Sequence, residues 1–309
     1  MKLQPAVEAY VGLKQSLGFR FATDSRILRA FSKAMGRRNL GQVKAAAVRA
    51  HLNGEGLLTR NWERKWVALR GFYAFALARG FVRRSPLPAQ APRIVQSFTP
   101  YIYSVEELRR LLGAITPERI PRRVSAATFR TLLLLLYGAG LRLGEALRLE
   151  ESDVDFQERL LYVRQSKFFK TRLVPVGPKL AKALENYAGE CPQTHHPDRP
   201  FFRTAQGTPL SRAVVERAFR RLCVAVDIKR NGGARSQPRL HDLRHTMATH
   251  CLVNGYRQGT DVQSLLPRLS TYLGHVDIGS TQKYLTATAE LRDQASARFA
   301  RYALGGAHE

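Results

Sequence analysis

Arg142 stands in a setting that suits it to hold a phosphate group. It follows the helix-breaking run Gly138-Ala139-Gly140 and so falls at the start of a helix, where free backbone N–H groups also favour anions. Its planar fork of donors matches phosphate oxygens, and Glu145, three residues further on, is near enough to orient it. The chemistry this would serve is phosphoryl transfer at a phosphodiester, which needs fixed cations, a nucleophile and a proton donor for the leaving oxygen.

A second segment, His241-Asp242-Leu243-Arg244-His245, offers another arginine and two histidines. Spacings of three and four residues place His241, Arg244 and His245 near one face of a helix. The two histidines are superficially similar to the zinc motif H-E-x-x-H, but Asp242 replaces the glutamate and the sequence offers no evident third ligand. We therefore expect no metal site here.

The proton donor and the nucleophile have candidates in two further segments. Lys167 lies in the turn 166–170 of an expected hairpin, from which its ammonium group could protonate a leaving oxygen. Lys170 in the same turn is the rival for that role, and a merely solvated basic turn is the alternative. His275 follows a glycine, and nine positions later comes Tyr284, which taken alone would be an ordinary core or surface residue.

In this order, the segments resemble the conserved boxes of the tyrosine recombinases, the family of phage integrases, Cre-like recombinases and Xer proteins. The resemblance covers about residues 104–290, and the order and spacing of the boxes carry it. The matching positions are Arg142 and Glu145 in the first arginine box, Lys167 as the hairpin lysine, His241, Arg244 and His245 in the second box, and His275 and Tyr284 in the last.

The resemblance implies a role for each position. Tyr284 would attack a DNA phosphate, leaving a 3′-phosphotyrosyl bond and a free 5′-OH, while Arg142 and Arg244 hold the non-bridging oxygens and Lys167 protonates the departing 5′ oxygen. The others would assist: His241 in proton transfer with Tyr284, His275 by a hydrogen bond to the phosphate, and Glu145 and His245 as supporting residues. Because the protein–DNA ester keeps the energy of the broken bond, neither a cofactor nor a metal is required.

The same resemblance implies double-stranded DNA as the partner, bound by a dimer on one site and by a tetramer when two sites are joined. Two alternatives stay open: a type IB topoisomerase-like enzyme that relaxes DNA, and a non-catalytic DNA-binding relative. The short helical front part favours a recombinase, and the intact nucleophile and arginines argue against an inactive relative. The interval from His241 to His275 is long, which we interpret as a loop insertion at 255–268. That insertion, without an added arm-binding domain, favours an integrase of a mobile element.

These positions need a framework, and the hydrophobic pattern predicts one that is mainly α with a small antiparallel β-sheet. Residues 1–84 are expected to form a helical, DNA-binding domain. Its helices are expected at 5–17, 42–52 and 61–79, with another that is capped by Thr23 or Asp24 and runs to 37. The last of these carries an aromatic face, which we expect to be core rather than a surface that stacks on DNA.

A proline-rich stretch at 85–103 is expected to link this domain to a catalytic domain at 104–309, which opens with a capping box, Ser104 to Glu107. The catalytic domain should hold a buried helix at 124–137, a short helix at 144–149 and strands at 159–165 and 171–176. Further helices are expected at 178–189, 211–226, 241–253, 262–273 and 279–286, and a tail helix at 289–303 would pack on its own or on a neighbouring subunit.

Composition agrees with a nucleic-acid partner. The 309 residues include 50 Lys and Arg against 24 Asp and Glu, a formal charge of +26, and 44% are hydrophobic, enough for a core. The three cysteines form no C-x-x-C pair, and the apolar run Thr131 to Gly140 is too short to cross a bilayer. No signal peptide opens the chain, so we expect a cytoplasmic protein associated with the nucleoid.

Overall fold

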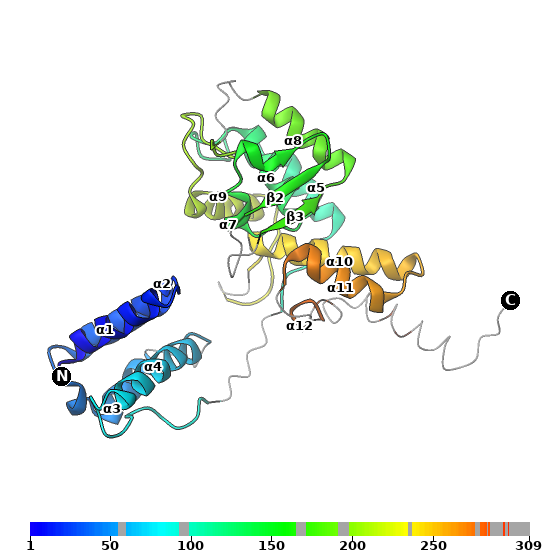
Figure 1. Cartoon of the computed structure of the whole chain (residues 1–309). Coiled ribbons are helices and arrows are strands. Elements are labelled where there is room, and N and C mark those ends of the chain that lie inside the picture. The colour runs from blue at the N-terminus through cyan, green and yellow to red at the C-terminus, as the bar shows by residue number, and fades with distance from the viewer. Residues whose placement is uncertain are drawn as a thin grey trace. The chain divides into compact units, whose positions relative to one another are not determined.

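The chain forms two compact units, Met1–Phe98 and Thr99–Glu309 (Figure 1). The structure is a computed structural model that describes residues 1–54, 60–92, 99–164, 171–190, 198–233, 237–275 and 279–282 and the single residues 284, 293 and 296. The division between the units falls within the stretch 85–103, and binding of DNA by the first unit stays a prediction. None of the described helices is both long and apolar enough to cross a membrane.

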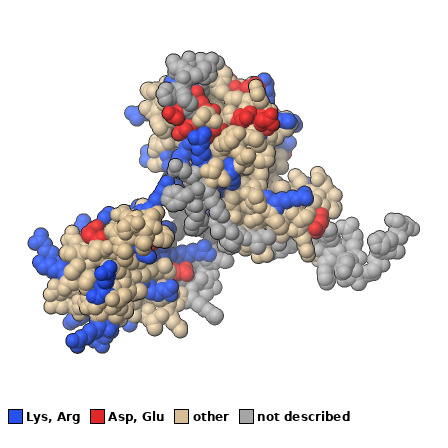
Figure 2. Space-filling model, viewed as in Figure 1, with Lys and Arg blue, Asp and Glu red and all other residues tan. Residues whose placement is uncertain are grey.

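In its described part, the first unit is a bundle of α-helices in which α4 packs against the other three. The helices are α1 (Leu3–Ser16), α2 (Ala22–Met35), α3 (Ala45–Asn53) and α4 (Arg60–Ala78), with a 3₁₀ turn at Leu40–Gln42. The aromatic face expected to be core is buried, which confirms that prediction; its members are Trp62, Trp66, Leu69, Phe72, Tyr73 and Ala76. Lys and Arg are the main charged groups on the visible face of this unit (Figure 2).

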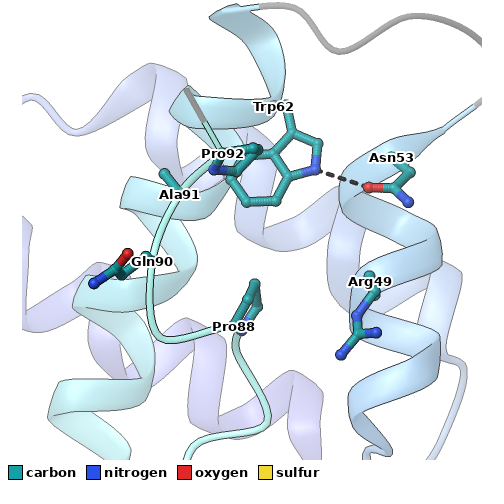
Figure 3. A pocket seen from close by; sticks show the side chains of 7 residues that line it. All are labelled: Arg49, Asn53, Trp62, Pro88, Gln90, Ala91 and Pro92. Carbon is teal, nitrogen blue, oxygen red and sulfur yellow. Dashed lines mark hydrogen bonds between the residues drawn. The ribbon is translucent and has the colours of Figure 1, made fainter. Parts of the chain in front are cut away.

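The prolines after α4 fold back onto this bundle. The Trp66 indole N–H donates to the carbonyl of Pro88 at 3.0 Å, and that of Trp62 donates to Asn53 Oδ1 at 2.9 Å. An open hollow lies beside Trp62 between α3 and the proline-rich segment (Figure 3). Thus the part of the expected linker up to residue 92 belongs to the first unit, because the buried indole N–H of Trp66 takes the Pro88 carbonyl as its acceptor.

Helix α2 begins without the cap that the sequence predicts. We expected Thr23 or Asp24 as the N-cap, but the helix starts at Ala22 and its N-cap is Phe21, in the left-handed region at φ 46° with no side-chain cap. The Phe21 ring packs edge-on against Tyr10 with 5.5 Å between centroids. The cap prediction is therefore wrong, because aromatic packing outweighs a hydrogen bond of about 1 kcal/mol.

The second unit is mainly helical with a three-stranded antiparallel sheet, which confirms the predicted fold class (Figure 1). The strands are β1 (Val154–Asp155), β2 (Leu160–Val163) and β3 (Arg172–Pro175), in the order β1-β2-β3, with Leu161 opposite Val174. The helices are α5 (Val105–Gly113), α6 (Ala126–Gly138), α7 (Leu143–Ala146), α8 (Pro178–Glu190), α9 (Arg212–Ala225), α10 (Leu240–Arg257), α11 (Val262–Leu273) and α12 (Gly279–Gln282), with a 3₁₀ turn at Glu151–Asp153.

Helix α6 forms the centre of this unit and packs against α8 and α10. Its Leu132 and Leu135 are fully buried, as expected for a helix with apolar residues on most sides. The capping box predicted at the start of α5 is present: Ser104 Oγ accepts from Glu107 N at 3.1 Å and Glu107 Oε2 accepts from Ser104 N at 2.7 Å. The packing of α6 against α10 fixes the end of α6, which leads to Arg142, and the start of α10, which carries Arg244.

The expected loop insertion at 255–268 is wrong. Helix α10 continues to Arg257, and α11 begins at Val262 after Asp261, whose carboxylate accepts from Gln263 N and Ser264 N. Gly255 permits the close contact of the two helices, because a Cβ there would lie 2.5 Å from Leu265 Cδ2. Glycine and proline signals suggested a loop, but packing of apolar side chains between α10 and α11 decides for helix.

Candidate active site

Arg142 lies where the sequence predicts it, at the N-cap of α7, and its guanidinium is partly accessible. Its Nη1 donates to Glu145 Oε1 at 2.7 Å and its Nη2 to the carbonyl of Gly274 at 3.3 Å. The side chain keeps 28% of its surface exposed. The preceding Gly140 has φ 59°, and a Cβ there would meet Met247, so the turn that presents Arg142 requires glycine.

Glu145 is the buried hub beneath Arg142. Its two carboxylate oxygens accept from Arg142 and also from Arg172 Nη1 and Nη2 at 3.2 and 3.0 Å, and its side chain is only 2% exposed. Burial by itself would raise the pKa of Glu145, but the hydrogen bonds and charges of Arg172 and Arg142 outweigh it and hold the pKa at about 2. The carboxylate therefore stays ionised throughout the neutral range.

Arg244 is the most deeply buried cation of the site. Its Nη1 donates to the carbonyl of Gly140 and its Nη2 to the carbonyl of Leu273, both at 2.6 Å, and the residue is 2% exposed. Burial and the nearby Arg142 lower the pKa of Arg244 to about 10, which leaves it protonated at neutral pH. One guanidinium thus joins the turn before Arg142 to the end of α11, the helix that leads towards Tyr284.

Four aromatic rings form a chain across the site. The ring centroids of His241 and His245 lie 4.8 Å apart, those of His245 and Tyr284 5.4 Å, and those of Tyr284 and His275 6.1 Å. His275 Nδ1 is hydrogen-bonded to Thr281 Oγ1 at 2.7 Å. The ring of α10 that contacts Tyr284 is thus His245, and His241 lies one ring further out, exposed at the surface of the site.

Tyr284 is sheltered, with 3% of its surface exposed. Burial raises the pKa of its phenol, while a hydrogen bond and the positive charge of Arg244 act in the opposite direction. The phenol is therefore protonated at neutral pH, and reaction at its oxygen requires removal of a proton. Arg244 is the cation placed to stabilise the phenolate as it forms.

The lysine candidates Lys167 and Lys170 lie outside the described residues, as does most of the expected tail helix 289–303. Arg172, at the start of β3, is a residue of the site that the sequence interpretation missed. Its signal was its place at the end of the basic turn, where the next strand begins, but nothing in the sequence links it to Glu145. Among the described residues no three His, Cys, Asp or Glu side chains gather as metal ligands would.

A cationic hollow of about 580 Å³ adjoins Arg142 and His241. Its other polar lining comes from α9 and from the residues just before α10: Arg212, Glu216, Arg220, Gln237 and Arg239. On the visible face of this unit, acidic side chains gather instead towards the upper part of the view (Figure 2). The hollow therefore extends the positive surface of the site away from Arg142, as binding of phosphates next to a reacting one would require.

The second unit should lose stability in acid through His245. Burial, and next the charges of His241 and Arg244, lower the pKa of His245 from 6.5 to about 3. No described residue accepts or donates a hydrogen bond at its Nδ1. Because the folded pKa is the lower one, the unfolded chain binds the proton more tightly, so this stability is complete above pH 6.5 and is lost as pH falls towards 3.

His245→Phe keeps a ring in place and removes this titration. Between pH 7.5 and about pH 4.5 the wild type should lose about 2 kcal/mol more unfolding free energy than the variant. Urea unfolding followed by far-ultraviolet circular dichroism measures the difference. An equal loss in both proteins would show that His245 is not the group responsible.

Comparisons with known proteins agree with this geometry. Residues 103–290 match the model of the phage integrase family. A Sinorhizobium fredii protein named as an integrase/recombinase, y4rB, is 33% identical over 304 residues, covering 96% of each chain. Tyrosine recombinase XerC of Chlorobaculum tepidum is 34% identical over 265 residues, covering 77% of this chain and 72% of the relative.

Solved structures show the same fold. The lambda integrase dimer bound to a COC′ core site superposes with a TM-score of 0.69 at 19% identity, covering 93% of this chain and 78% of that one. The Tn1549 transposon integrase in complex with circular intermediate DNA gives 0.67 at 17% identity, covering 96% and 99%. The chain belongs to the phage integrase family, the tyrosine recombinases, which break and rejoin DNA.

Proposed function

We propose that this protein is a site-specific recombinase whose nucleophile is Tyr284. The observation that carries the proposal is the convergence of the Tyr284 phenol with Arg244 and Arg142, two cations from different parts of the chain. The phenolic oxygen forms a bond to phosphorus, the bond from phosphorus to the 5′ oxygen breaks, and the 3′ end stays attached to the protein. Attack by the 5′-OH of another strand reverses the step with exchanged ends.

The remaining residues have complementary roles in this proposal. Arg142, with an accessible guanidinium, and Arg244 neutralise the non-bridging oxygens as charge develops on them. Lys167 gives a proton to the departing 5′ oxygen. His275 donates to the phosphate, and His241 assists the transfer of the phenolic proton, with His245 as the supporting ring between His241 and Tyr284.

A nicked DNA duplex tests the nucleophile directly. Sites are first selected from a randomised duplex library by binding, and a nick beside the scissile phosphate lets the short 5′-OH fragment diffuse away, so the covalent intermediate accumulates. We expect a protein–DNA adduct whose DNA is attached to the peptide that contains Tyr284, located by mass spectrometry. Attachment to any other residue, or no adduct at all, would contradict the proposal.

Recombination, rather than relaxation alone, is the activity favoured by the helical first unit and by the relatives named as recombinases. A plasmid carrying two selected sites distinguishes the two activities: a recombinase exchanges the sites and alters the restriction pattern, whereas a topoisomerase-like enzyme only relaxes supercoils.

We further propose assembly as a dimer on one site and a tetramer on two, as the lambda integrase structures on a core site and on a Holliday junction suggest. Light scattering of the DNA complexes measures both stoichiometries.

We also propose that the DNA belongs to a mobile element and that the protein associates with the nucleoid. The mobile element is supported by the Tn1549 transposon integrase, which has the same fold. The loop insertion expected at 255–268 no longer supports it, because α11 occupies Val262–Leu273. A small circular DNA that carries two selected sites tests the mobile-element proposal: we expect it to integrate into a second plasmid.

DNA binding should weaken steeply with salt, and the hollow should contribute to the slope. Arg220→Ala removes one cation of the hollow, so the slope of log affinity against log salt concentration should become less steep by about one unit. Arg109→Ala is the matched control, because Arg109 pairs with Glu106 on α5 outside the hollow. Fluorescence anisotropy with a selected duplex over a salt series measures the slopes; equal slopes for Arg220→Ala and the wild type would remove the hollow from the DNA surface.

A further inference from the structure

Arg172 makes contacts that tie three separate chain segments together beneath the site. From the first position of β3 its Nη1 and Nη2 donate one to each oxygen of Glu145 on α7, at 3.2 and 3.0 Å. Its Nε donates to the carbonyl of Tyr272, near the end of α11, at 3.2 Å. The side chain is 12% exposed, so this fork is held away from solvent.

The two-point contact determines what Arg142 can do with the same carboxylate. Arg172 donates to both oxygens, and the backbone N–H of Arg142 also donates to Oε2 at 3.0 Å. The Arg142 side chain therefore reaches Glu145 through Nη1 alone, and its Nη2 makes only a 3.3 Å contact with the carbonyl of Gly274. An arginine next to an unshared carboxylate would form the stronger two-point pair and turn both η nitrogens inward. Arg172, together with the backbone N–H of Arg142, thereby fills the carboxylate and keeps part of the Arg142 fork free for a phosphate.

The same guanidinium supports the turn that leads to His275. Gly274 has φ 66°, and a Cβ at this position would lie 2.9 to 3.1 Å from Arg172 Nη1, Cζ and Cδ. The turn therefore rests on the arginine with no room for a larger residue. Removing or shortening Arg172 releases both the turn and the carboxylate.

We infer that Arg172 is a positioning residue, which holds the Arg142 fork towards the phosphate by saturating Glu145 and supports the Gly274 turn. The inference rests on the proposed function, because it assigns Arg142 to the phosphate. Charge alone does not meet this requirement: a lysine keeps the cation but cannot bond to both oxygens and to Tyr272 at once. Arg172→Lys is therefore the informative change.

The first test compares two scissile groups in the nicked substrate. With a phosphodiester, Arg172→Lys should form adduct about 30-fold more slowly than the wild type, since a misplaced donor costs that order of transition-state stabilisation. With a methylphosphonate, which lacks one charged oxygen and needs the clamp less, the two proteins should differ by less than about 3-fold. An equal deficit on both substrates, or none on the phosphodiester, overturns the inference.

The controls separate this idea from simple instability. Arg164→Lys alters the arginine that follows β2, which pairs with Asp153 at 2.6 Å, and should leave the ratio between the substrates unchanged. Arg172→Gln provides a second, uncharged variant should the lysine variant unfold, with folding checked by circular dichroism. A Gln variant that folds is expected to show the same dependence on substrate.

A second measurement does not depend on catalysis. The side-chain ¹⁵N–¹H signals of Arg142, assigned by their absence in Arg142→Lys, should move in Arg172→Lys and stay in place in Arg164→Lys. Unchanged Arg142 signals overturn the inference even if the enzyme is active. Moved signals in a protein that forms no adduct would support the positioning role while contradicting the proposed function.

Discussion

Replacing Tyr284 with phenylalanine should abolish the covalent protein–DNA adduct and lower the rate of strand cleavage at least about 10,000-fold. The change removes one oxygen, the one that would bond to phosphorus, and leaves the ring between His245 and His275. Affinity for intact DNA should stay within about 3-fold of the wild type, because the phosphate contacts come from arginines. Gel assays of the nicked substrate and anisotropy with an intact duplex measure the two effects.

Tyr272→Phe is the matched control for this change. Tyr272 lies near the end of α11, and its hydroxyl donates to the carbonyl of Pro175 at 3.2 Å, so its loss removes a phenolic oxygen close to the site but outside the ring chain. It should form adduct at close to the wild-type rate. If Tyr284→Phe and the wild type trapped DNA equally, the assignment of the nucleophile would fail.

Arg244→Ala should lower cleavage about 1,000-fold and also destabilise the second unit by about 3 kcal/mol. The loss of rate follows from removal of the buried cation that acts on the Tyr284 phenol. Instability follows from the carbonyls of Gly140 and Leu273, which lose their donor while still buried. The same residue thus serves chemistry and the closure of the fold.

Two further variants separate these effects. Arg244→Lys keeps a cation but reaches one carbonyl at most, so it should recover part of the stability and little of the rate. Arg130→Ala, an exposed arginine on α6, should alter neither. Urea unfolding and single-turnover cleavage measure both quantities; a stable Arg244→Ala variant with wild-type cleavage would exclude Arg244 from the site.

Local pattern predicts a large part of this structure. The capping box of α5, the buried face of α4 and the pair of Arg142 and Glu145 depend on residues three or four positions apart, which the helix itself brings together. The loop predicted at 255–268 failed because Gly255 serves the contact of two helices, and the cap at Thr23 or Asp24 failed because Phe21 packs on Tyr10. In both cases a distant partner outweighed a local preference.

The sequence by itself determined the family's order of boxes, the mainly helical fold and the residue types suited to a phosphate. Only the tertiary structure decided that Arg172 binds Glu145, 27 positions before it, and shares that carboxylate with Arg142. It also decided that Arg244 joins Gly140, 104 positions before it, to Leu273, 29 positions after it. It also decided that the ring contacting Tyr284 from α10 is His245. Such contacts depend on how packed helices and strands meet in space, and residue spacing along the chain carries no direct record of that meeting.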